Sequence, residues 1–170
     1  MHNAFFIVHR ALPVVSAYLD ALKMLARREL SEAQIRQRLA RREHAADAVD
    51  AAVERLRAER AIDDRRVAEA IARTQSSLKR RGKLRIRREI EHAGIARGTA
   101  QTVVDEVFAD VDGDALLEQS LAKRMRARTK IADQKEFNRL YRYLVGQGFE
   151  PDRVLAVLKT HKGHKEHEED

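Results

Sequence analysis

The sequence of 170 residues contains no cysteine and no tryptophan, and only two prolines. Without cysteine the chain has no disulfide bonds, no thiolate nucleophile and no cysteine-ligated zinc, which is compatible with a reducing, cytoplasmic setting. Aromatic residues make up only 5% of the chain, so stacking of single-stranded bases on aromatic rings is not expected to dominate a nucleic-acid contact. No catalytic triad, carboxylate pair or glycine-rich phosphate loop is found, and we predict a protein that is not an enzyme and needs no cofactor.

Long apolar runs are also missing. The apolar run near the N-terminus covers only residues 4–8, whereas a membrane-spanning helix needs roughly 20 apolar residues. We therefore predict no membrane partner. The first fifteen residues, 1–15, are predicted to be a poorly ordered leader, and residues 161–170 a disordered polar tail.

Charge, in contrast, is abundant. Charged residues make up 36% of the chain, with 34 basic and 27 acidic side chains and a formal net charge of +7. This exceeds what a compact domain of this size needs on its surface, and it favours an extended shape with a high ratio of surface to core. Because both signs are present throughout, the excess positive charge predicts local basic patches.

The pattern of apolar residues predicts an all-α protein, because they recur at intervals of three and four and no segment alternates with a period of two. Capping boxes begin at Ser31 and Asp133, and Pro151 occupies a place where the first helical turn tolerates it. Gly94 and Gly148 are each followed by a large apolar residue, which is typical of a helix that ends in a left-handed glycine.

The chain also repeats itself. Shifts of 51 and then 54 residues superpose apolar positions across two helices, and such self-similarity is typical of tandem repeats. The superposed residues include Ile35, Ile86 and Leu140, and Leu39, Ile90 and Leu144. We predict three three-helix, helix-turn-helix-like repeats, at residues 16–60, 61–111 and 112–160, in an elongated, curved monomer. The first repeat has Glu43 where the others have glycine, and its turn is expected to be looser.

The second repeat carries a recognisable pattern of residues. It consists of Ile62-Asp63-Asp64, Val67-Ala68, Arg81-Gly82, Arg85-Ile86-Arg87-Arg88-Glu89-Ile90 and Gly94-Ile95. This pattern resembles the RecX family, bacterial regulators of the RecA recombinase, and Leu144-Val145-Gly146-Gln147-Gly148-Phe149 is similar to the family's C-terminal pattern. The resemblance covers about residues 17–160. The chain departs from it at Lys83, where the family often has proline.

The resemblance implies a cytoplasmic regulator that binds in the helical groove of a RecA filament on DNA. Such a protein mainly inhibits the ATPase and strand-exchange activities of RecA, in recombination, DNA repair and the SOS response. Capping, groove blocking and disassembly of the filament all stay open as modes of action. The alternative hypothesis is a helical protein that binds DNA directly and largely without sequence preference.

Two basic clusters are the predicted partner-binding or DNA-binding surface. The stretch LKRRGKLRIRRE, residues 78–89, and a second cluster about 40 residues later fall at equivalent places in neighbouring repeats. The predicted residues are Lys79, Arg80, Arg81, Lys83, Arg85, Arg87, Arg88, Lys123, Arg124, Arg126, Arg128 and Lys130. Solvated helix faces and the preference of cations for helix C-termini are the alternative explanation. The first repeat has a similar group that is interspersed with acids and receives less weight, namely Arg27, Arg28, Arg36, Arg38, Arg41 and Arg42.

Three acidic or histidine motifs are interpreted as structural, and no metal site is predicted. Asp63-Asp64 precedes a helix, which favours an N-cap over a catalytic pair. Residues 110–114 resemble the start of a calcium loop, but the required glycine and glutamate are absent further on, which favours a linker with a helix cap. The tail contains His161, His164 and His167, and these histidines are expected to be solvated.

Overall fold

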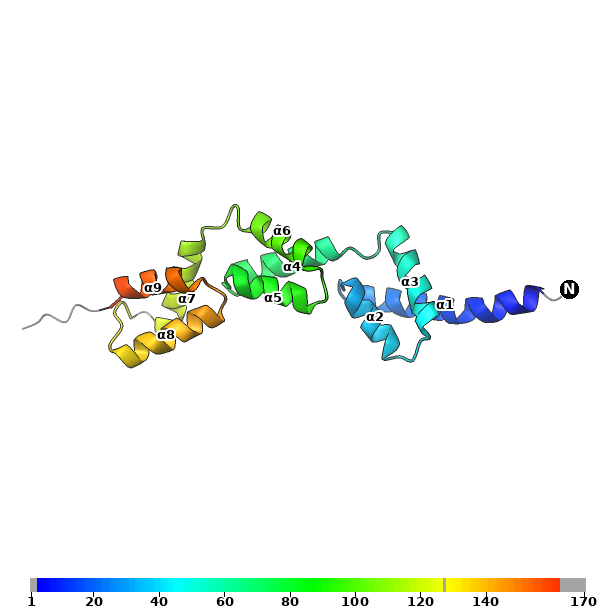
Figure 1. The fold of residues 1–170 in the computed structure, drawn as a ribbon, viewed down its shortest axis with the longest axis horizontal. Coiled ribbons are helices and arrows are strands. Elements are labelled where there is room, and N and C mark those ends of the chain that lie inside the picture. The colour runs from blue at the N-terminus through cyan, green and yellow to red at the C-terminus, as the bar shows by residue number, and fades with distance from the viewer. Residues whose placement is uncertain (1–2, 127, 163–170) are drawn as a thin grey trace, which may run out of the picture. The chain divides into compact units, whose positions relative to one another are not determined.

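A computed structural model describes residues 3–126 and 128–162, with side chains from residue 14 onward. Within this part of the chain the regular secondary structure is helical, apart from one isolated β-bridge between Ile131 and Lys162. Figure 1 shows the helices, which are α1 (Asn3–Leu25), α2 (Glu32–Ala40), α3 (Ala46–Ala58), α4 (Asp64–Ser77), α5 (Lys83–His92), α6 (Arg97–Val107), α7 (Gly113–Met125), α8 (Gln134–Gly146) and α9 (Pro151–Thr160). We refer to α1–α3, α4–α6 and α7–α9 as modules 1, 2 and 3. The all-α prediction of three-helix repeats is confirmed, and no described helix has the length and apolarity needed to cross a membrane.

The apolar positions that superpose in the sequence are buried in all three modules. Ile35, Ile86 and Leu140 are at most 1% exposed, and Leu39, Ile90 and Leu144 are fully buried. In module 1 these side chains belong to a core that α1 closes from one side, with Ala17 and Ala21 fully buried against residues of α2 and α3. Small alanines on this face of α1 permit close helix packing, so a small module still buries a continuous apolar cluster.

The helix ends follow the predicted cap chemistry. Ser31 accepts a hydrogen bond from the backbone N–H of Gln34, and the Gln34 side chain accepts one from the N–H of Ser31, which completes the capping box of α2. Asp133 caps α8 by accepting from the N–H of Glu136, but the predicted box is incomplete because the Glu136 carboxylate accepts from the N–H of Ala132 and not from that of Asp133. Pro151 starts α9. Each cap satisfies N–H groups that a helix start leaves without intrahelical partners.

The three α2-like helices end in the same closure. Gly94 and Gly148 have φ angles of 81° and 92°, and the residue after each donates its N–H to a carbonyl five residues back. Glu43 adopts the same conformation, with φ 62°, and His44 donates to the carbonyl of Leu39. The expectation of a looser first turn is therefore wrong, because the two closing hydrogen bonds form although Glu43 carries a Cβ.

Contacts divide the chain into two compact units, which we describe separately. Unit 1 contains Met1–Ala68 and Ile90–Ala100, and unit 2 contains Glu69–Glu89 and Gln101–Asp170. The division passes through all three helices of module 2, so that module 2 contributes residues to both units.

In unit 1 the end of α5 packs against the start of α2. The fully buried hydroxyl of Ser31 donates to the carbonyl of Ala93, so the residue that caps α2 also binds the end of α5. A Cβ added at Gly94 would lie 2.3 Å from the Cβ of Ala33. The backbone N–H of Glu32 donates to the carboxylate of Asp64, which adds a third link. We call this set the Gly94 contact.

In unit 2 an equivalent contact joins the end of α8 to the start of α5. The N–H of Gly82 donates to the carbonyl of Gln147 at 3.0 Å, and the N–H of Leu84 donates to the carbonyl of Gly148 at 3.1 Å. A Cβ at Gly82 would lie 2.3 Å from the Gly148 oxygen, and a Cβ at Gly148 would lie 2.3 Å from the Arg85 nitrogen. We call this the Gly148 contact. The 51-residue and 54-residue shifts lay Ser31 on Gly82 and Gly94 on Gly148, so the repeat extends to the contacts between modules.

The two chain ends differ from the prediction where the structure describes them. Helix α1 begins at Asn3 and passes through the segment for which a poorly ordered leader was predicted. Once a helix is nucleated each further residue adds a backbone hydrogen bond, and α1 extends back from a well-packed segment. At the other end His161 and Lys162 contact module 3, while residues 163–170 of the predicted tail, including His164 and His167, lie outside the described part.

Candidate basic interaction surfaces

Part of the central basic cluster serves the fold. Arg81 forms an ion pair with Glu89 and donates to Gln75 at 2.7 Å, and only 17% of its side chain is exposed. Arg85 lies 3.4 Å from Glu89 and donates to the carbonyl of Gly146 at 3.1 Å. These two arginines hold α5 against its neighbours, and Arg85 takes part in the Gly148 contact.

Lys83 begins α5 and Arg87 lies one turn later, and both face α6. Lys83 is 3.4 Å from the carboxylate of Asp105 and lies over the Phe108 ring, 5.5 Å from its centre. Arg87 donates to Gln101 at 2.7 Å. A hydrogen bond from Gln101 and the nearby Lys83 ammonium lower the pKa of Asp105, which keeps the carboxylate ionised beside these cations. Lys83 and Arg87 are half-buried and thus only partly available to a partner.

Of the remaining members of the central cluster, Lys79 and Arg88 are more available. Arg80 is half-buried, has a positive φ of 51° and donates to Gln119 at 3.2 Å. Lys79 and Arg88 are exposed; Arg88 donates only to the carbonyl of Leu84, and Lys79 makes no side-chain hydrogen bond or ion pair within the described residues. The structure therefore separates this cluster into an anchoring set and an exposed set.

The second cluster divides in the same way. Arg128 donates to both carboxylate oxygens of Glu136, at 2.6 and 3.3 Å, and Arg124 lies over the ring of Tyr143, 5.1 Å from its centre. The N–H of Ala132 and the guanidinium of Arg128 lower the pKa of the buried Glu136 carboxyl. All five members of this cluster are exposed, and the three without a side-chain partner among the described residues are Lys123, Arg126 and Lys130.

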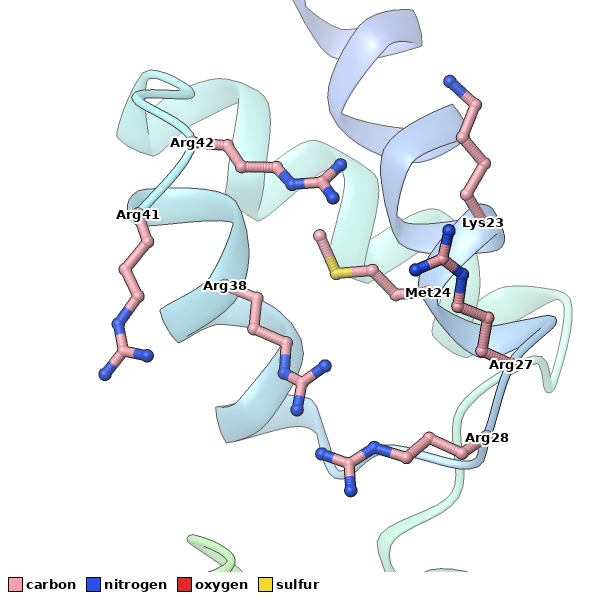
Figure 2. A pocket seen from close by; sticks show the side chains of 7 residues that line it. All are labelled: Lys23, Met24, Arg27, Arg28, Arg38, Arg41 and Arg42. Carbon is pink, nitrogen blue, oxygen red and sulfur yellow. The ribbon is translucent and has the colours of Figure 1, made fainter.

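A further concentration of basic side chains surrounds a hollow in module 1, at residues that the sequence analysis did not include in the predicted surface. A hollow of about 440 Å³ is lined by Lys23, Met24, Arg27, Arg28, Arg38, Arg41 and Arg42. Figure 2 shows Arg28 and Arg38 extending toward one another from the chain after α1 and from α2, while Arg41 points away. We call this surface the basic hollow. These residues lie on two separate segments, so their positions in the sequence do not show that the side chains converge. The packing of α1 against α2 brings them together.

Few acidic groups neutralise the basic hollow. Asp20 lies 3.3 Å from Lys23 and 3.2 Å from Arg42. Its pKa is lowered chiefly by a hydrogen bond from His44 at 3.1 Å. Arg36, which the sequence grouped with these residues, instead pairs with Glu32 and Asp50 and does not line the hollow.

The acidic motifs have structural roles, as predicted. Asp63 accepts from the N–H groups of Arg65 and Arg66 at the start of α4, and Asp112 caps α7. Asp64 has a role that the sequence did not reveal, because it accepts from Glu32 in the Gly94 contact. Among the described residues no group of three or more potential ligands is arranged to hold a metal ion.

His161 is not a solvated tail residue. Its ring lies 3.0 Å from the carbonyl of Thr129 at Nδ1 and 3.0 Å from the carboxylate of Glu118 at Nε2. The bond to Thr129, followed by the bond to Glu118, raises the pKa of His161 above its ordinary value. The prediction of solvation is wrong for this residue because α9 ends beside α7 and the loop before α8.

The helical modules and their basic surfaces place this chain in the class of three-helix-repeat proteins. Comparison with known proteins identifies its family within that class. The family model for the first three-helix domain of RecX matches residues 17–56, and that for the second matches residues 63–104. A protein named Regulatory protein RecX from Halorhodospira halophila is 34% identical over 138 residues, which are 81% of this chain and 83% of that protein. The chain belongs to the RecX family of regulatory proteins.

Other relatives agree with this assignment. Regulatory protein RecX of Chlorobium phaeobacteroides is 31% identical over 81% of this chain and 88% of its own. That of Geobacillus thermodenitrificans is 30% identical over 92% of this chain, which spans only 58% of that longer protein. The crystal structure of RecX from Lactobacillus salivarius has a TM-score of 0.70 at 19% identity, covering 88% of this chain and 97% of that one. Another RecX crystal structure has a TM-score of 0.78 at 20% identity, covering 94% and 78%, and both show the same fold.

Proposed function

We propose that this protein binds the RecA filament on DNA and restrains its ATP hydrolysis and strand exchange. The observation that carries the proposal is membership of the RecX family over most of the chain, including its two family domains. The protein acts by contact and not by catalysis, since a regulator that occupies a filament groove needs surface complementarity only.

The exposed part of the two predicted clusters is the surface we assign to the partner. Lys79, Lys123 and Lys130 are exposed and have no acidic side chain within ion-pair distance in the described part of the chain. Arg81 and Arg128 are bound by Glu89 and Glu136, so their removal would damage the protein itself. The anchoring arginines therefore support the surface and the exposed lysines contact the partner.

The test is inhibition of the cognate recombinase by wild type and by the variant Lys79→Ala/Lys123→Ala/Lys130→Ala. Each rim charge contributes about 0.5 kcal/mol, and three together reach about 1.4 kcal/mol, which is about tenfold in affinity. We expect half-maximal inhibition of the DNA-dependent ATPase and of strand exchange at about tenfold higher concentration. Helicity and melting temperature should be unchanged.

A matched control removes the same charge elsewhere. Lys135, Arg142 and Lys159 are exposed in module 3 and have no side-chain partner in the described residues. Their triple Ala variant should inhibit like wild type. If wild type leaves both activities unaffected, the proposed function is wrong; if the control loses as much as the test variant, the assigned surface is wrong.

A further inference from the structure

The basic hollow of module 1 is not explained by folding or by the clusters assigned to the partner. Four of its arginines, Arg27, Arg28, Arg38 and Arg41, make no side-chain hydrogen bond or ion pair within the described residues, and the first three of these extend into the hollow. We propose that it is a binding site for closely spaced phosphate groups, as in one nucleic-acid strand or a free polyphosphate chain.

The balance of charge favours an anion. Six cationic side chains line the hollow, whereas Asp20 is the one carboxylate that pairs with any of them among the described residues. The C-termini of α1 and α2 lie nearby and explain some of the arginines, but a helix end supplies only about half a negative charge. Repulsion among the remaining cations is relieved when a ligand brings several negative charges.

The donor chemistry matches phosphate. A guanidinium presents a planar fork of N–H donors that binds two oxygens of one phosphate, and it stays charged at any physiological pH. Arg27 and Arg28 follow α1, while Arg38 lies on α2, so their forks reach the hollow from two sides (Figure 2). Donors from two segments can hold neighbouring phosphates at the same time.

The rest of the lining indicates that phosphate, and not a base, is recognised. Met24 is the one apolar side chain of the lining, and it is 8% exposed. No aromatic ring or amide side chain lines the hollow to stack on a base or to read its edge. Binding should accordingly be independent of sequence and strongly dependent on salt.

The test compares wild type with Arg27→Gln/Arg28→Gln/Arg38→Gln, in the absence of recombinase. Binding of a fluorescent single-stranded oligonucleotide is measured by anisotropy across a salt series, and binding of tripolyphosphate by calorimetry. We expect the variant to bind at least about tenfold more weakly, with a slope of log affinity against log salt that is lower by roughly 0.7 for each lost phosphate contact. Circular dichroism should be unchanged because these side chains have no partners to lose.

The control and the two probes make the outcome decisive. Lys135→Gln/Arg142→Gln/Lys159→Gln removes equal charge and should change affinity less than about threefold. Loss confined to the oligonucleotide assigns the site to a nucleic-acid strand, and loss confined to tripolyphosphate assigns it to a free polyphosphate. If neither probe is affected, or if the control loses as much, the proposal is overturned.

Should the triple variant fold poorly, Arg28→Lys, which keeps the charge but not the fork, should still weaken binding. Since no recombinase is present, the result is independent of the proposed function.

Discussion

His161 is held at both ring nitrogens, and its protonated form donates to Thr129 and Glu118 together. The raised pKa means that the folded protein binds this proton more tightly than the unfolded chain, so the stabilisation is complete below the unfolded pKa of about 6.5. It is lost as the pH rises through the higher pKa of the folded state. We predict that His161→Gln lowers the stability of module 3 by roughly 0.5–1 kcal/mol near pH 6, and by less as the pH rises.

The measurement is the melting temperature of both proteins from about pH 6 to pH 9, bracketing the pKa of imidazole from below and above. Glu118→Gln is the control, because it removes the carboxylate and leaves the bond to Thr129. It should show an intermediate pH dependence. Parallel curves for wild type and His161→Gln would contradict the assignment of a stabilising proton to this ring.

At the same scale, sequence alone located the basic clusters but not the role of each member. Arg81 and Lys79 are two positions apart in one run of charge, yet Arg81 is 17% exposed and paired with Glu89 while Lys79 is exposed. The direction of a side chain just after a helix depends on the closing turn, and the turn after α4 has Arg80 at a positive φ. The convergence of Arg28 and Arg38 depends on tertiary packing and leaves no periodic signal.

At the scale of the elements, the left-handed helix closures predict opposite effects on stability for introducing a glycine and for removing one. Glu43 has a φ of 62°, which costs a residue with a Cβ about 1–2 kcal/mol, partly offset by the entropy that glycine loses on folding. We predict that Glu43→Gly stabilises the protein by roughly 0.5 kcal/mol. Gly148→Ala should destabilise it by about 2 kcal/mol or more, since the new Cβ would also collide with the backbone of Arg85.

Urea unfolding of each variant provides the free energies. Gly146→Ala is the matched control, because Gly146 ends α8 with open space around it and should be neutral or slightly stabilising. Gly82→Ala separates the strain of a positive φ from the collision of the new Cβ. Gly82 lacks a positive φ, but a Cβ added there would meet the Gly148 oxygen. If Gly82→Ala and Gly148→Ala are as harmless as the control, the Gly148 contact does not hold the modules.

Most of the helical architecture could be predicted because its signals are local. The box at Ser31, the glycines at 94 and 148 and the repeated buried positions such as Ile35 and Ile86 act within a few residues or recur at fixed spacing. The contacts between modules could not be predicted in this way. Gly82 reaches Gln147 through backbone groups, which every residue carries and no sequence pattern marks. The hydroxyl of Ser31 donates to the carbonyl of Ala93, which is likewise a backbone group 62 residues away.

For the whole molecule, the net charge of +7 understates the local excess. Acidic residues such as Glu89 and Glu136 are used to hold particular arginines in place, whereas the basic hollow and the exposed lysines keep most of their charge. We expect a protein with this distribution to bind polyanions through ion release, and that part of its affinity should fall steeply with salt. A contact with protein surface in a filament groove also buries apolar area, which salt weakens far less.

This difference in salt dependence predicts how the affinity of the protein for bare DNA compares with its affinity for the recombinase filament on DNA. We expect the filament to bind at least about tenfold more tightly at about 0.15 M salt, and with a shallower salt dependence than the same DNA without recombinase. Anisotropy titrations of one labelled oligonucleotide, bare and coated with recombinase and a non-hydrolysed ATP analogue, give both slopes. Lys79→Ala/Lys123→Ala/Lys130→Ala should narrow the gap mainly by weakening the filament complex. Equal affinities and equal slopes would instead favour the alternative function, in which the helical repeats bind DNA directly and the recombinase adds no contact of its own.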